Sequence, residues 1–165
     1  MQTKRRRSFE AGHRPKFLVV VDESEECGRA VHFAARRAAR LGAGVVMLTI
    51  VAPGEFPHWL GVGDVMKDEA EDAASELQEK FAAHAREVAG LEPEKVIRTG
   101  VKSEEILKLI TEDEDISYLV LAAGTGSEGP GPLVTSLASK TASSFPIPVV
   151  LVPGGLLDEE IDALT

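Results

Sequence analysis

The residues best suited to binding chemistry are four closely spaced glycines in one predicted loop. They are Gly124, Gly126, Gly129 and Gly131. Because glycine tolerates positive φ and carries no side chain, a ligand can approach the main-chain N–H groups of such a loop closely. A helix is predicted from about Leu133, and the start of a helix offers unpaired N–H donors and a positive dipole end. This combination is typical of a phosphate-binding site, but a flexible connection without a ligand has the same composition.

An acidic residue is predicted at the same edge of the molecule as the glycine loop. Asp22 follows the apolar run 17–21, and Val51 ends a second apolar run, 45–51. The loop itself follows a third run, 116–123. In an open parallel sheet, ligands bind beyond the carboxyl ends of the strands, where the strand order reverses. The sequence therefore predicts a binding cleft between Asp22 and the loop.

Strand-like and helix-like patterns alternate along the whole chain. Apolar runs predict strands at 17–21, 45–51, 95–99, 116–123 and 149–152. Apolar residues three and four positions apart predict an amphipathic helix in each interval. Such alternation indicates an α/β fold, in which a five-stranded open parallel sheet carries helices on both faces in a Rossmann-like arrangement.

Serine and acidic residues indicate where two of these helices begin. Ser24 is expected to cap the first helix, with Glu26 in its first turn. Ser103 is expected to cap the third helix, which then begins at Glu104. The fourth helix is expected to continue to about Ser143.

Composition predicts one globular domain with a polar segment at each end. The chain has 165 residues, 44% of them hydrophobic, and it contains no apolar run long enough to cross a membrane. Its net charge of -9 argues against general nucleic-acid binding, and its single cysteine excludes an internal disulfide. We expect a basic, flexible arm at 1–15, a folded domain at 16–153 and an acidic tail at 154–165. Because no apolar signal segment follows the basic start, a cytoplasmic location is expected.

From about Lys16 to Pro153, the chain resembles the universal stress protein family. The resemblance rests on Asp22 and Ser24 after the first strand, on Gly100 after the third, and on the closing segment FPIPVVLVP. It implies a fold of the adenine-nucleotide alpha-hydrolase type. It also implies that the protein is a regulator of the stress response that binds ATP.

The nucleotide-binding branch of the family has a loop of the form G-x-x-G, nine residues, then G-[ST]. This loop holds the phosphates of ATP, which a magnesium ion can accompany, and the aspartate after the first strand meets the nucleoside. By this resemblance, the nucleotide is expected to contact Val21, Asp22, Val51, Ala123, Gly124, Gly126, Gly129, Thr135, Ser136 and Leu137.

The loop of this chain departs from that motif. Ala123 stands where the first glycine is expected, Gly124 lies one place further on, and Thr135 replaces the last glycine. Glu128 brings a carboxylate, and like charges about 4 Å apart repel by ~4 kcal/mol at an effective dielectric near 20. Two functions therefore stay open. One is an adenine-nucleotide-binding regulator with at most slow ATP hydrolysis. The other is a dimeric interaction module whose altered loop binds no nucleotide, or binds another anion.

The last strand is expected to form a homodimer interface. The strand Val149–Val152 is short, apolar and predicted at an edge of the sheet, where unpaired strands are a liability. In the family that the chain resembles, this strand pairs with its copy across a two-fold axis. Four apolar residues of the acidic tail are expected to dock on the partner subunit: Leu156, Leu157, Ile161 and Leu164.

Other chemistry finds little support in the residue pattern. The histidines are scattered and show no spacing typical of metal ligands. Cys27 falls on the apolar stripe of the first helix, so packing is favoured over reactivity. No nucleophile and base are spaced as a catalytic pair, so no catalytic residue is assigned.

Overall fold

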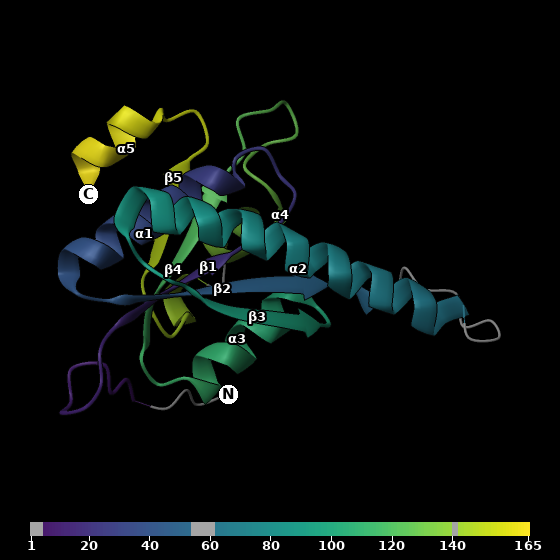
Figure 1. Cartoon of the computed structure of the whole chain (residues 1–165), viewed down its shortest axis with the longest axis horizontal. Helices are drawn as coiled ribbons and strands as arrows, with labels where there is room; N and C mark the ends of the chain where they lie inside the picture. Colours follow the sequence, from purple (N-terminus) through teal and green to yellow (C-terminus); the bar gives the residue numbers. More distant parts are fainter. Residues whose placement is uncertain (1–4, 54–61, 140–141) are drawn as a thin grey trace.

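A five-stranded parallel sheet with the order β3-β2-β1-β4-β5 forms the centre of the molecule (Figure 1). The computed structural model describes residues 5–53, 62–139 and 142–165. The strands are β1 (Lys16–Val20), β2 (Gly44–Val51), β3 (Glu94–Thr99), β4 (Ile116–Ala123) and β5 (Val149–Pro153). In the centre of the sheet, Val19 of β1 lies opposite Met47 of β2 and Val120 of β4. The predicted parallel sheet and α/β fold are confirmed.

Helices cover both faces of the sheet. They are α1 (Cys27–Leu41), α2 (Val62–Ala89), α3 (Lys102–Glu112), α4 (Pro132–Ala138) and α5 (Asp158–Leu164), with a 3-10 turn, η2 (Ala142–Ser144). α1, α2 and α5 pack on the face to which Val19 points, whereas α3 and α4 pack on the face of Leu18. α1 and α2 lie side by side, and the first turns of α2 extend past the strand ends (Figure 1). Within the described residues, no helix combines the length and hydrophobicity needed to cross a bilayer.

The predicted start of the first helix is wrong. α1 begins at Cys27, its N-cap is Glu26, and no side chain caps it. The hydroxyl and the backbone N–H of Ser24 instead donate to Oδ1 of Asp22, at 2.5 and 2.9 Å. This Asx-type turn keeps Ser24 ahead of the helix.

The limits of two further helices also differ from the predictions. α3 begins at Lys102 with Val101 as its N-cap, so Ser103 lies inside the first turn and does not cap the helix. α4 ends at Ala138 rather than near Ser143. Serine and threonine are frequent after Val134, and they compete for backbone hydrogen bonds, which favours turns over a long helix.

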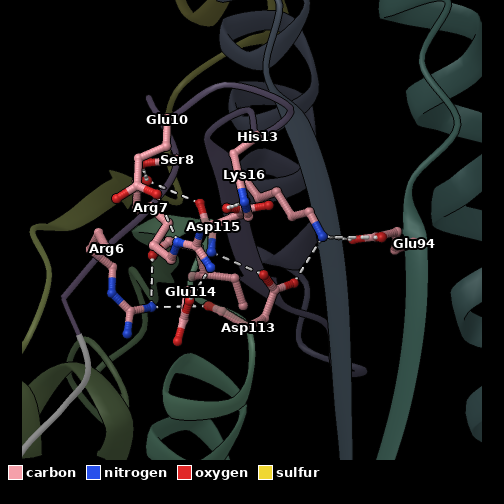
Figure 2. Close-up of polar contacts among 12 residues, drawn as sticks. Arg6, Arg7, Ser8, Glu10, His13, Lys16, Glu94, Asp113, Glu114 and Asp115 are labelled. Carbon is pink, nitrogen blue, oxygen red and sulfur yellow. Dashed lines mark hydrogen bonds and ion pairs between the residues drawn. The ribbon is translucent and has the colours of Figure 1, made fainter.

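The N-terminal segment lies against the turn 113–115 at the amino end of the sheet (Figure 2). Nη1 of Arg6 donates to the carbonyl oxygens of Ile110 and Asp113, at 2.6 and 3.0 Å. These carbonyls lie at the C-terminal end of α3, where no intrahelical donor remains for them. Nδ1 of His13 lies 2.7 Å from Oδ1 of Asp115. The sequence predicts a flexible arm at 1–15 and does not predict these contacts. Residues 1–4 of that arm lie outside the described residues.

The C-terminal helix α5 packs on α1 and α2 through a polar network. His32 of α1 is buried, and its Nδ1 lies 3.1 Å from Nε2 of His84 on α2. Its Nε2 lies 2.7 Å from Oδ1 of Asp162 on α5. The same carboxylate oxygen lies 3.1 Å from Nε of Arg36. The network ties the end of the chain to both helices on this face.

The apolar residues of the acidic tail do not share one environment. Ile161 is fully buried in the core beneath α1, and Leu156 packs against the same core. The predicted docking of Ile161 on a partner subunit is therefore wrong, because its side chain is buried within the chain. The docking of half-buried Leu156 stays a prediction. Leu157 and Leu164 are exposed.

Candidate functional site

Two adjacent hollows lie at the carboxyl edge of the sheet. The first, of about 140 Å³, lies between the ends of β1 and β4 and is lined by Glu26, Leu121 and Gly131, among others. The second, of about 310 Å³, lies between the ends of β1 and β2 and the side of α2. Asp22 and Lys102 line both hollows, which together form a cleft that we call the switch-point cleft. Strand order reverses between β1 and β4, which is where open parallel sheets bind ligands.

The first hollow begins at the turn after β1. One carboxylate oxygen of Asp22 accepts both donors of Ser24, so the carboxylate is fixed in orientation. The N–H of Asp22 donates to Sγ of Cys27 at 3.4 Å, and that thiol lies 3.8 Å from the carbonyl oxygen of Val20. Burial raises the pKa of Cys27 to about 12, so the thiol stays protonated and serves packing. The turn therefore holds the carboxylate of Asp22, which lines the cleft, through one of its two oxygens.

The second hollow is mainly apolar. Its floor contains Val21 and Val51, and its wall contains Ala70, Ala73 and Leu77 of α2. A volume of about 310 Å³ is at the lower end of the range of ~300–1,000 Å³ typical of small-molecule pockets. A flat apolar ring would suit this surface, because the small alanine side chains leave room against the helix.

The glycine loop is partly closed by its own hydrogen bonds. The N–H of Gly124 donates to the carbonyl oxygen of Pro130 at 3.0 Å, and that of Gly129 donates to Gly126 at 3.1 Å. Gly129 and Gly131 have φ values of 87° and 110°, which favour glycine. The N–H groups of Gly124 and Gly129 are therefore already hydrogen-bonded within the loop, whereas the sequence predicts a loop whose N–H groups are free to bind phosphate.

The helix that follows the loop offers few donors to a ligand. α4 has seven residues and begins at Pro132, which has no N–H. Thr135 directs both its N–H and its hydroxyl to the carbonyl oxygen of Gly131, at 3.0 and 2.9 Å. Pro132 therefore removes one donor from the helix start, whereas the bond from Thr135 N–H is the ordinary i→i−4 bond of the first turn.

The structure brings together only some of the residues that the sequence assigns to the site. Asp22 lines both hollows, and Val21 and Val51 line the second. The remaining seven line neither hollow: Ala123, Gly124, Gly126, Gly129, Thr135, Ser136 and Leu137. Leu137 packs instead against the apolar core beneath α3 and α4. The part of the loop that faces the cleft is the segment 130–134.

Two charged residues of the cleft were missed or misplaced by the sequence predictions. Lys102 is exposed at the start of α3, and within the described residues it has no hydrogen bond or ion pair. Glu26 is half-buried beside the loop, and its Oε1 lies 3.2 Å from the point where a Cβ on Gly124 would lie. Lys102 could have been predicted, because it follows Gly100 at the end of β3 and the carboxyl ends of parallel strands meet at one edge of the sheet.

Comparison with known proteins agrees with this architecture. A family model described as the universal stress protein family matches residues 13–153. Universal stress protein UspA from Lactobacillus plantarum is 19% identical, with a TM-score of 0.66 over 84% of this chain and 97% of that one. The universal stress protein from Archaeoglobus fulgidus in complex with dAMP is 22% identical, with a TM-score of 0.59 over 84% of this chain and 97% of that one.

A further structural relative was solved with a second nucleotide. A universal stress protein in complex with cAMP is 18% identical, with a TM-score of 0.59 over 86% of this chain and 98% of that one. Among curated proteins, no sequence matches the chain. The family model spans most of the chain, including every strand of the sheet. On this evidence the chain belongs to the universal stress protein family.

Proposed function

We propose that this protein binds an adenine nucleotide in the switch-point cleft and acts as a nucleotide-dependent regulator of the stress response. The observation that carries the proposal is that two adjacent hollows meet at Asp22 and Lys102, one lined by alanines of α2 and the other by the loop segment 130–134. An adenine nucleotide has a flat apolar ring at one end and a charged phosphate at the other. The apolar second hollow suits the ring, and Lys102, which lines both hollows, offers a cation to the phosphate.

In the proposed complex, the adenine lies in the second hollow against Val21 and Val51. The ribose lies beside Asp22, whose free carboxylate oxygen accepts from a hydroxyl group. The phosphate lies in the first hollow near Lys102 and Gly131. The expectation of ATP with magnesium comes from the family resemblance alone, and a binding role is proposed here rather than catalysis.

The structural relatives support the choice of ligand class. The relative from Archaeoglobus fulgidus was solved with dAMP, and another relative was solved with cAMP. Both ligands pair adenine with a single phosphate. The shared fold makes the same edge of the sheet the natural place to search in this chain.

Calorimetric titration with adenosine, AMP and ATP tests the proposal. Ala73 is an exposed residue of α2 that lines the second hollow, so Ala73→Phe fills the adenine position without altering the core. We expect it to weaken binding at least about tenfold, the equivalent of ~1.4 kcal/mol. Ala83→Phe makes the same change at an exposed position of α2 outside the cleft, and it should leave binding unchanged. Absence of binding by all three ligands, or equal loss in both variants, would contradict the proposal.

A second role, as a dimeric interaction module, is favoured by the edge strand β5. Among the described residues, β5 pairs only with β4, and Leu151 within it is 44% exposed. We propose that β5 pairs with its copy in a homodimer, which would cover this apolar edge. Light scattering after size-exclusion chromatography tests this. Leu151→Arg should convert dimer to monomer, and a wild-type protein that is monomeric at micromolar concentration would rule the interface out.

A further inference from the structure

Two charged residues that the sequence predictions did not place in the site, Lys102 and Glu26, line the cleft. Lys102 lines both hollows and has no ion-pair partner in the described part of the chain. Its ammonium group is therefore available to a bound anion. Charge-assisted hydrogen bonds of this kind are among the stronger polar contacts in proteins.

Glu26 acts in the opposite sense. Its Oε1 lies 3.2 Å from the Cβ position of Gly124, and its own Cβ lies 2.8 Å from the Cβ position of Gly154. The side chain is thus enclosed between the beginning of the glycine loop and the turn after β5. No cation pairs with it among the residues that the structure describes, so its negative charge is directed at the space beside the loop.

The lining of the cleft is acidic overall. The charged residues that line the two hollows are Asp22, Glu23, Glu26 and Lys102. One ammonium group offsets part of the charge of a single phosphate, but each further phosphate of a di- or triphosphate adds negative charge near Glu26. The N–H groups of Gly124 and Gly129 cannot offset this charge, because they are already bonded within the loop.

We propose that the switch-point cleft selects adenine nucleotides with a single phosphate, with Lys102 binding the phosphate and Glu26 rejecting longer polyphosphates. This inference rests on the proposed function. It adds a rank order to it: AMP binds more tightly than ADP, and ADP more tightly than ATP, when no divalent cation screens the phosphates. Adenosine measures the contribution of the base and ribose alone.

The test is a calorimetric titration of the full chain with adenosine, AMP, ADP and ATP in EDTA. Wild-type protein should bind AMP at least about tenfold more tightly than ATP, a difference equal to ~1.4 kcal/mol. Lys102→Ala should weaken AMP about tenfold or more and weaken adenosine much less, because adenosine carries no phosphate. Glu26→Gln should raise the affinity for ATP about fivefold or more and leave adenosine unchanged.

Matched controls separate local from general charge effects. Lys80→Ala removes a positive charge, and Glu25→Gln removes a negative one, at residues that do not line the cleft. Neither control should change the ratio of AMP to ATP affinity, and thermal melting should show that all four variants fold.

The outcomes distinguish the inference from the proposed function. Equal affinity for AMP and ATP in EDTA, or a ratio that Glu26→Gln leaves unchanged, would overturn the charge selection while nucleotide binding stands. A loss of adenosine affinity in Lys102→Ala equal to the loss of AMP affinity would overturn the role of Lys102. Failure of every ligand to bind, adenosine included, would overturn both.

Discussion

A steric prediction at Gly154 follows from how closely the turn after β5 approaches the cleft. A Cβ added to Gly154 would lie 2.6 Å from the carbonyl oxygen of Ala123 and 2.8 Å from Cβ of Glu26. The N–H of Gly154 also donates to that same carbonyl oxygen at 2.8 Å. Neither neighbour is the free end of a flexible side chain, so the backbone must move to admit even a methyl group.

The loss of stability caused by Gly154→Ala can be given an order of magnitude. Overpacking in a well-packed region costs about 1–3 kcal/mol, and two contacts this short belong in the upper part of that range. We therefore expect the free energy of unfolding to fall by about 2–3 kcal/mol. For a chain of this length the unfolding entropy converts that loss into a melting temperature lower by on the order of 6–9 °C.

Gly155 provides the matched control. A Cβ there would lie 3.6 Å from Cγ2 of Thr125, which is an ordinary contact. Gly155→Ala should therefore be neutral, or more stable by up to about 1 kcal/mol through the unfolded state. Urea unfolding followed by circular dichroism measures both variants. If Gly154→Ala and Gly155→Ala differ by less than about 0.5 kcal/mol, the reasoning from close approach is wrong.

Three further predictions concern groups outside the cleft. Gln78 is buried, and its Nε2 donates to Met47 O, Val96 O and Thr49 Oγ1. Gln78→Leu should therefore lower the free energy of unfolding, measured by urea titration, by about 1–3 kcal/mol. An unchanged midpoint of urea unfolding would contradict this. Burial, followed by the charge of the neighbouring histidine, lowers the pKa of His84 in the folded protein. The unfolded chain therefore takes up the proton first as the pH falls, so the stability contribution should be intact above the unfolded-state pKa of about 6.5 and should be lost as the pH drops through the lower folded pKa. A melting temperature that rises as the pH falls through this window would oppose the prediction. Arg6→Ala removes donors to the last carbonyls of α3, so hydrogen exchange of the N-terminal segment should accelerate while the sheet stays protected.

The sheet could be predicted from the sequence because its signal is local. β1 is buried on both faces, so Leu18 and Val19 are both apolar although they point to opposite sides. A continuous apolar run of this kind, repeated between amphipathic helices, leaves few architectures open. The edge position of β5 also follows from the family resemblance and is found in the structure.

The details of the site could not be predicted, because they depend on contacts between distant segments. The side chain of Ser24 can either cap the first helix or donate a hydrogen bond to Asp22, and the sequence does not show which of the two forms. In the sequence, Lys102 resembles any solvent-exposed lysine, and only the fold shows that it lines a hollow with the ends of β1 and β2. Arg6 looks like part of a disordered basic run, because composition cannot show that α3 ends opposite it (Figure 2).

The close approach at Gly154 and the charge of Glu26 concern one point of the molecule. The Oε1 of Glu26 lies 3.2 Å from the Cβ position of Gly124, and its Cβ lies 2.8 Å from the Cβ position of Gly154. The turn at Gly154 is held by its hydrogen bond to Ala123, at the end of the strand that leads into the loop. A methyl group at Gly154 would therefore press on Glu26 as well as on the end of β4. The carboxylate to which we assign the rejection of longer polyphosphates thus lies where β4, the loop and the turn after β5 meet, so Gly154→Ala should disturb charge selection together with stability.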